Sequence, residues 1–233
     1  MAGPVRLNST PCEGLMMIRT LGRHVDHDPR NRGFAHPEPV AGQVMQPVLW
    51  PRYSKILSQG DLGACTGNAM AGWIGTAPHC RTAKQAARYD EAYAVALYSK
   101  ATRLDNVPGH YPPTDTGSTG LAAAKAAKAF GEISSYTWAF TTSALLHALQ
   151  HGPVIAGITW YQQMFDPDSA GEVHIGGDAA GGHEILIRGF QDDMLLCDNS
   201  WGADWGLNGS FRLSLATWEQ LRAEQADVTI PHP

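Results

Sequence analysis

Apolar residues recur at helical spacing in the first part of the chain and form short, strand-like runs in the last third. Helices are predicted over residues 66–74, 89–104, 121–130 and 142–150. Strands are predicted over residues 154–159, 185–189, 194–198, 210–213 and 228–230. Because helices and strands are segregated along the chain, we expect an α+β protein.

The first 46 residues follow neither pattern. They are rich in proline, glycine, histidine and arginine and have no sustained period, which predicts an irregular arm over residues 1–46. A mainly helical part is then expected over residues 47–140 and a mainly β part over residues 141–233.

Cys65 follows a loop that contains two glycines and opens the first predicted helix. A thiol becomes a strong nucleophile as the thiolate, which a helix N-terminus and a neighbouring imidazolium both favour. The backbone N–H of Cys65 and the side-chain amide of Gln59, in the same loop, are placed to converge on a developing oxyanion. The sequence therefore predicts a nucleophile with an oxyanion site beside it.

His183 and Asn199 lie at the ends of two predicted strands that a two-residue turn at 192–193 would join as a hairpin. Antiparallel pairing brings both residues to the same end of the sheet. There the Asn199 amide oxygen can accept a hydrogen bond from an imidazole N–H and fix the ring. We expect His183 to act as the base and Asn199 to orient it.

Gln59, Cys65, His183 and Asn199, in this order and in these local settings, resemble the papain-like cysteine peptidases. The resemblance extends from about residue 47 to residue 218. The pattern Cys-Thr-x-Asn-Ala around the nucleophile is closest to compact bacterial and viral members. The resemblance implies a two-lobed fold in which a helical left lobe carries the nucleophile, a β-barrel-like right lobe carries the histidine and asparagine, and the active-site cleft lies between them.

The resemblance also implies five substrate-binding residues: Gly117, Gly120, Gly182, Trp201 and Trp205. The first tryptophan would cover the histidine–asparagine hydrogen bond, and the second would line the leaving-group side of the cleft. The glycines would form walls on which an extended peptide binds by strand addition.

Two positions depart from the family pattern. Leu62 replaces the cysteine that typically forms a disulfide three residues before the nucleophile. Glu184 replaces the small residue that often follows the catalytic histidine, and its burial would need a partner such as Arg188.

Other reactive side chains are expected to be structural or solvated. Cys12, Cys80 and Cys197 are expected to be structural thiols, as lone cysteines in apolar settings usually are. His174 is a rival base without a rigid strand to hold it. A further polar loop lacks tight metal-ligand spacing, so no metal and no cofactor are expected; its residues are Asp105, His110 and Asp115.

Composition excludes several classes of function. The chain has 233 residues, 43% of them hydrophobic, and a net charge of −5, which leaves no basic stripe for nucleic acid. Neither an apolar stretch of bilayer length nor a secretory signal pattern is found, so no membrane partner is expected. With one of four cysteines assigned to catalysis, at most one disulfide can form, which favours a cytoplasmic or virion-associated location. The sequence does not indicate an oligomeric state.

The arm has two possible roles. It can brace the two lobes from behind, or it can run through the cleft and block it. Related precursors use a helical inhibitory segment of many tens of residues, and this arm is short and irregular, so bracing is expected.

The expected function is hydrolysis of peptide bonds, as an endopeptidase, through a thioester formed on the nucleophile. The substrate would be a protein or peptide. One alternative is an acyl transferase or peptidoglycan-cleaving amidase with the same catalytic set. A second is a catalytically silent binding or assembly protein on the same scaffold.

Overall fold

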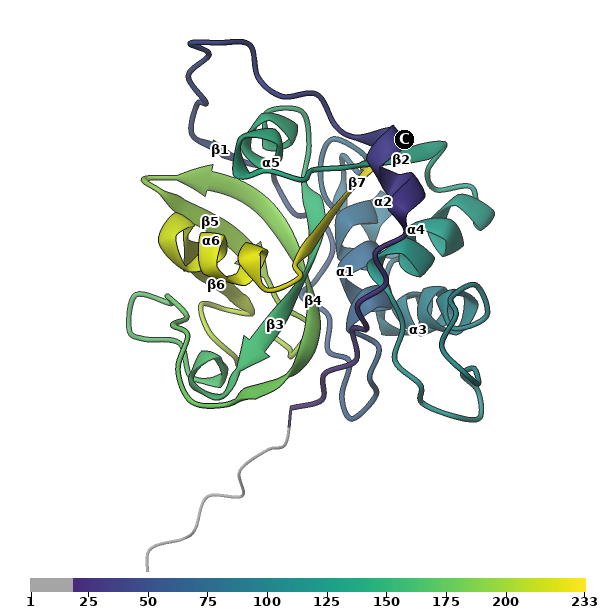
Figure 1. Ribbon diagram of the computed structural model, residues 1–233. Helices are drawn as coiled ribbons and strands as arrows, with labels where there is room; N and C mark the ends of the chain where they lie inside the picture. Colours follow the sequence, from purple (N-terminus) through teal and green to yellow (C-terminus); the bar gives the residue numbers. More distant parts are fainter. Residues whose placement is uncertain (1–18) are drawn as a thin grey trace, which may run out of the picture.

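The computed structural model describes residues 19–233 (Figure 1). Its helical elements are η1 (Pro29–Phe34), α1 (Cys65–Ile74), α2 (Ala83–Ala86), α3 (Glu91–Ala101), α4 (Gly120–Ala129), α5 (Thr142–Leu149), η2 (Gln162–Phe165) and α6 (Leu215–Ala223). Its strands are β1 (Val48–Leu49), β2 (Ser135–Trp138), β3 (Val154–Tyr161), β4 (Ala179–Gln191), β5 (Met194–Asp198), β6 (Ser210–Ser214) and β7 (Asp227–His232). All four predicted helices and all five predicted strands are confirmed. The sequence analysis missed β2 and α6 and the shortest elements.

Helix α1 is held by packing rather than by its own sequence. Its N-cap residue, Ala64, offers no side-chain cap, and two internal glycines lower its helix propensity. Nine of its ten residues are nevertheless buried, which explains why it forms. The neighbouring helix α4 has an ordinary start, where the Thr119 side chain accepts from the Ala122 N–H.

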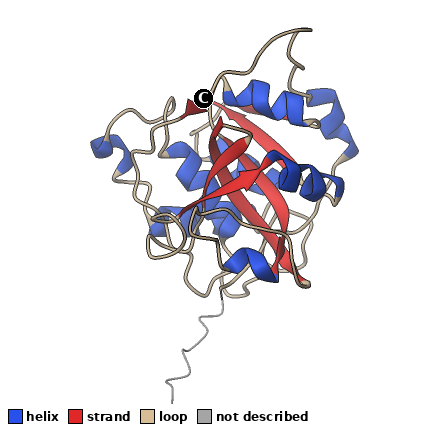
Figure 2. Ribbon diagram, turned by 90° about the vertical axis from the view of Figure 1, so that its left-hand side faces the viewer, coloured by secondary structure: helices blue, strands red, loops and turns tan. Residues whose placement is uncertain are grey.

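The strands described form one antiparallel sheet in the order β2-β7-β3-β4-β5-β6, with β1 paired to β4 (Figure 2). The hairpin β4–β5 turns at Asp192 and Asp193, whose φ angles of 51° and 60° suit the type I′ turn that two-residue hairpins favour. Leu186 pairs with Asp198 beyond the turn. This register brings His183 and Asn199 to one end of the hairpin.

Two hydrophobic cores lie on opposite faces of the sheet. One fills the space under α5 and α6, and the other lies against α1, α3 and α4 (Figure 1). Strand β4 contributes to both, because Ile185 and Ile187 belong to the first core and Leu186 to the second. The architecture is the expected α+β arrangement of a helical lobe against a β lobe.

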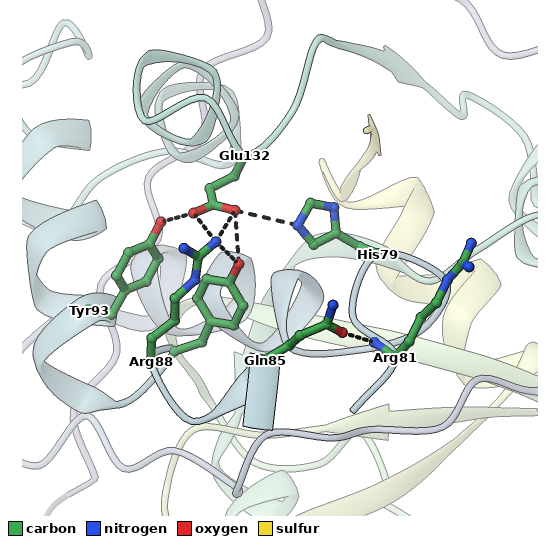
Figure 3. Close-up of polar contacts among 7 residues, drawn as sticks. His79, Arg81, Gln85, Arg88, Tyr93 and Glu132 are labelled. Carbon is green, nitrogen blue, oxygen red and sulfur yellow. Dashed lines mark hydrogen bonds and ion pairs between the residues drawn. The ribbon is translucent and has the colours of Figure 1, made fainter. Parts of the chain in front are cut away.

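Glu132 ties together the outer end of the helical lobe (Figure 3). Its carboxylate accepts hydrogen bonds from the Tyr93 hydroxyl at 2.7 Å and the Tyr89 hydroxyl at 3.0 Å. His79 and Arg88 also lie within 3.4 Å of it. The carboxylate thus links α3 to the segment that follows α4.

None of the helices within residues 19–233 has both the length and the apolar character that crossing a membrane requires. The described cysteines, Cys65, Cys80 and Cys197, are buried and form no disulfide with one another. Cys12 lies outside the described residues.

Candidate active site

The four residues expected to act in catalysis meet where the two lobes face each other. Cys65 is the first residue of α1 and is fully buried. Backbone groups of Glu184, Thr66 and Gly22 lie close enough to its sulfur to oppose the rise that burial causes in its pKa. Since Glu184 directly follows His183 on β4, these contacts place the thiol beside the histidine.

The hydrogen bonds around Asn199 fix the tautomer of His183. The Asn199 Oδ1 atom accepts from the Ser200 backbone N–H at 2.7 Å, which identifies it as the amide oxygen. The same oxygen lies 2.7 Å from His183 Nε2, so Nε2 carries the proton. His183 Nδ1 has no hydrogen-bond partner in residues 19–233 and keeps its lone pair. The unprotonated nitrogen is the one that can act as a base.

Aromatic rings enclose the histidine. The Trp201 ring is stacked on the imidazole, with centroids 4.8 Å apart and planes at 26°. Trp160 meets the imidazole edge-on at 5.1 Å. Trp205 lies underneath, edge-on to Trp201 at 5.1 Å, and donates its indole N–H to the Phe165 carbonyl. It supports Trp201 from the core.

Burial keeps the thiol and the imidazole uncharged in this structure. Desolvation raises the pKa of Cys65 to about 12. It lowers the pKa of His183 to about 4, against the opposing effect of the Asn199 hydrogen bond. A thiolate–imidazolium pair is therefore disfavoured as long as water is excluded from the cleft.

The Gln59 side chain already holds a carbonyl oxygen. Its amide group donates to the Leu62 carbonyl at 2.8 Å and to the Thr20 carbonyl at 3.0 Å, while its own oxygen accepts from the Ser200 hydroxyl. The Trp201 indole N–H also donates to Thr20, at 3.3 Å. A donor suited to an oxyanion is thus occupied by the arm.

Residues 20–24 of the arm run through the groove between the lobes (Figure 1, purple segment between the strands and the helices). The Gly22 and Arg23 N–H groups donate to the Gly182 carbonyl at 3.2 and 3.0 Å. On the other wall, Ser118 donates to the Gly22 carbonyl at 2.8 Å and accepts from the His24 N–H at 2.7 Å. The segment is an added strand that covers Cys65.

The expectation that the arm braces the lobes from behind is wrong for residues 20–24 and fits the later part of the arm. There the His36 N–H donates to the Trp138 carbonyl at 2.8 Å, and the Gln46 N–H donates to Gln150 at 3.1 Å. The cleft segment escaped prediction because it binds through its backbone, which leaves no periodic pattern of side chains.

The predicted glycine walls lie against the arm. A Cβ atom on Gly117 would come within 2.5 Å of the Gly22 carbonyl oxygen, and φ at Gly117 is +67°. Gly182 supplies the carbonyl described above. Gly120, the first residue of α4, lies deeper and faces the Glu184 carboxylate. The sequence analysis missed Ser118 and Ser200, although both stand inside motifs that it had singled out.

Arg188 is not the partner of Glu184, contrary to the sequence-based expectation. The Arg188 guanidinium binds Asp198 at 2.6 Å and the Trp50 carbonyl at 2.8 Å. Glu184 is buried without a hydrogen-bond partner among the described residues. Arg188 pairs with Asp198 rather than with Glu184 because the Asp198 carboxylate, on the neighbouring strand of the hairpin, lies directly opposite the guanidinium.

The remaining candidates lie apart from the site or hold its walls. His174 is exposed and contacts Asp168 at 3.1 Å. In the polar loop, Asp115 accepts from the Gly63 N–H at 2.7 Å and Asp105 accepts from the Ser118 hydroxyl at 2.6 Å. The two carboxylates are therefore structural anchors of the cleft loops rather than merely solvated groups.

Comparisons with known proteins agree with this geometry. A sequence profile described as "Papain family cysteine protease" matches residues 54–229. Cathepsin B-like cysteine proteinase 4 of Caenorhabditis elegans is 39% identical over 75 residues, which cover 30% of this chain and 22% of that protein. Cathepsin B-like CP3 of Giardia intestinalis is 23% identical over 197 residues, which cover 71% of this chain and 66% of that protein. The chain thus spans about a fifth to two thirds of the length of these curated relatives.

Solved structures share the fold. Xylellain, a cysteine protease from Xylella fastidiosa, superposes with a TM-score of 0.67 at 16% identity, covering 92% of this chain and 96% of that one. The bromelain protease from Ananas comosus, in complex with the E64 inhibitor, superposes with a TM-score of 0.51 at 13% identity, covering 79% and 99%. At these identities the likeness concerns the fold alone. With the profile match over most of its length, this chain belongs to the papain family of cysteine proteases.

Proposed function

We propose that the protein is a cysteine endopeptidase of the compact bacterial or viral kind, acting through Cys65, His183 and Asn199. The carrying observation is the hydrogen bond from His183 Nε2 to Asn199, which leaves Nδ1 unprotonated and without a hydrogen-bond partner in residues 19–233, so that it can serve as the base. The Cys-Thr-x-Asn-Ala pattern around Cys65 supports the subtype.

In the proposed reaction, His183 takes the thiol proton of Cys65, and the Cys65 sulfur attacks a peptide carbonyl to form a thioester. His183 then passes this proton to the leaving amine. The Gln59 amide and the Cys65 backbone N–H hold the oxyanion. Water, with His183 as base, then hydrolyses the thioester. Trp201 keeps water from the His183–Asn199 hydrogen bond, and Gly182 and the wall at 117–120 bind the substrate backbone.

The described form is proposed to be a closed one. The Gln59 side-chain amide donates its hydrogen bond to the Thr20 carbonyl instead of to a substrate. Residues 20–24 cover the thiol, and the burial keeps it protonated. A substrate has to displace this segment before Cys65 can react.

An epoxide thiol probe followed by mass mapping of the labelled residue tests the nucleophile. We expect label at Cys65 well before Cys80 or Cys197, and no peptide hydrolysis by the Cys65→Ala variant. Hydrolysis that survives this substitution would rule out the proposal. Adding a free amine as acceptor distinguishes a transferase, which would form a new amide in place of the acid.

A further inference from the structure

The side chain of Arg23 is buried in a pocket beside the nucleophile. Only 1% of it is exposed, although it belongs to a segment that lies over the surface of both lobes. Its guanidinium forms an ion pair with Asp227, on β7, and donates to the Gln225 carbonyl at 2.9 Å. Gly22, next to it in the chain, packs against Gly63 in the nucleophile loop, and its backbone lies near enough to the Cys65 thiol to affect the pKa of that thiol. The pocket is therefore one residue away from the reactive sulfur.

Glycines make the room for this guanidinium. A Cβ atom built on Gly157 would lie 2.9 Å from Arg23 Cζ and even closer to Nε, and one on Gly182 would lie 3.2 Å from Cδ. Gly157 is in the middle of β3, where glycine weakens a strand and often marks the close approach of another group. Any side chain at that position would fill the pocket.

The pocket holds two carboxyl groups and only one guanidinium, that of Arg23. Glu184 is buried beside it with 1% exposure, and neither of its carboxylate oxygens has a hydrogen-bond partner within residues 19–233. Burial and the nearby Asp227 raise the pKa of Glu184, and Arg23 opposes that rise. Two carboxyl groups thus face a single guanidinium, and of the two the Glu184 side chain is the fully buried one. A buried carboxylate without a partner is costly, and a cation relieves that cost.

We propose that this pocket is the specificity pocket of the enzyme and binds the arginine or lysine side chain of a peptide substrate. The inference rests on the proposed peptidase function. Arg23 holds the place of the substrate side chain in the closed form. Ser118 and Gly182 hold the backbone on either side, as they hold the arm. Asp227 binds the cation, and Glu184 lies beside it as a second carboxyl group whose raised pKa a bound cation lowers, as Arg23 does in this structure.

The chemistry of the pocket favours arginine. A guanidinium presents several donors in a fixed plane and reproduces the contacts of Arg23, whereas lysine offers a compact ammonium. An apolar side chain would leave the largely buried Asp227 carboxylate unpaired, and a glutamate would place another acidic group beside it. A site built to pair a polar group discriminates strongly against ligands that lack it.

A small-ligand experiment separates a binding pocket from a salt bridge that merely fastens the arm. The full-length Arg23→Ala variant is titrated calorimetrically with ethylguanidinium, with the neutral isostere ethylurea as control. We expect ethylguanidinium to bind and ethylurea not to bind, and the added substitution Asp227→Asn to weaken ethylguanidinium binding about tenfold or more. Arg23→Gln replaces Arg23→Ala where the alanine variant does not fold by circular dichroism. Equal binding of both ligands, or of neither, overturns the inference.

A substrate panel then tests specificity in the same variant. Fluorogenic peptides carry arginine, its neutral isostere citrulline, leucine or glutamate at each of the positions preceding the leaving group. At one position we expect kcat/KM for arginine to exceed that for citrulline by about tenfold to a thousandfold, and Asp227→Asn to remove the difference. Hydrolysis with equal rates for arginine and citrulline at every position refutes the specificity pocket and leaves the peptidase standing. Binding of ethylguanidinium without hydrolysis of any peptide refutes the peptidase and with it the role of the pocket in substrate choice.

Discussion

Gly22 is the residue at which the closed form is most easily disturbed. It lies directly over the nucleophile loop, and a Cβ atom there would lie far inside the 3.4 Å contact distance from the Gly63 carbonyl oxygen. That oxygen belongs to backbone, which cannot rotate away. The substitution Gly22→Ala should therefore push residues 20–24 out of the groove by about 1 Å or more.

Such a displacement breaks the hydrogen bonds that hold the segment. Those at stake are the bonds from the Gly22 and Arg23 N–H groups to Gly182 and from Ser118 to Gly22, of 3.2, 3.0 and 2.8 Å. Each contributes about 0.5–1.5 kcal/mol net, so losing them costs about 2–4 kcal/mol. Since about 1.4 kcal/mol corresponds to a factor of ten, the open population should rise about 30-fold to 1,000-fold.

The second-order rate of Cys65 alkylation by an epoxide probe measures this population, and peptide turnover should rise in parallel. Gly33→Ala is the matched control, because Gly33 is in the same arm and a Cβ there meets nothing within 4 Å. The control should label at the wild-type rate. Equal labelling of wild type and Gly22→Ala would show that the segment does not limit access to the thiol.

Three further results are expected. Asn199→Ala should lower kcat about 10²-fold to 10⁴-fold by freeing the His183 ring, and it should also lower the melting temperature, because His183 and the Ser200 N–H lose their buried acceptor; unchanged kcat would mean that another group orients the ring. Glu132→Ala should lower the free energy of unfolding by about 1–3 kcal/mol in urea titrations, because the Tyr89 and Tyr93 hydroxyls lose their acceptor, and it should leave kcat/KM unaltered; a loss of activity at full stability would contradict the purely structural role. Acid should also destabilise the protein through His36, in the outer part of the arm. Burial, and to a smaller extent the nearby His147, lowers the pKa of His36 in the folded protein to about 4. The unfolded chain therefore takes up the proton first, and the stability present above about pH 6.5 is lost as the pH falls to about 4. The pKa of His183 is lowered to the same value, so His36→Gln should remove only part of the dependence of the unfolding free energy on pH, as measured by urea unfolding at each pH. An unchanged pH dependence in this variant would show that His36 does not contribute to it.

The parts of the fold that sequence could predict are those encoded locally. Two aspartates between apolar runs specify the hairpin turn. This turn fixes the pairing register of the two strands, which brings His183 and Asn199 together. Helix α6 was missed because it buries only Trp218 and Leu221, too few positions for a periodic signal. Strand β4 begins earlier than predicted, since its first residues are small and pair through their backbones.

The pocket around Arg23 could not be predicted in this way. Arg23, Glu184 and Asp227 come from the arm, β4 and β7, and no sequence spacing links them. Only the tertiary arrangement reveals that a glutamate next to the histidine faces an aspartate near the other end of the chain. The path of residues 22–24 between the lobes could not be predicted either, because their contacts with Gly182 and Ser118 are made by backbone atoms that every residue possesses.

The sharing of β4 between the two cores has a mechanical consequence. Neighbouring residues of this single strand, Leu186 and Ile187, are anchored in different lobes, so the lobes cannot swing apart without tearing one core or the other. Within residues 19–233 we therefore expect no hinge motion between the two lobes, and access to the proposed active site would depend on movement of residues 20–24 alone. Hydrogen exchange should show this division, with amides of β3 and β4 opening only when the whole molecule unfolds and those of residues 22–24 opening in far smaller fluctuations.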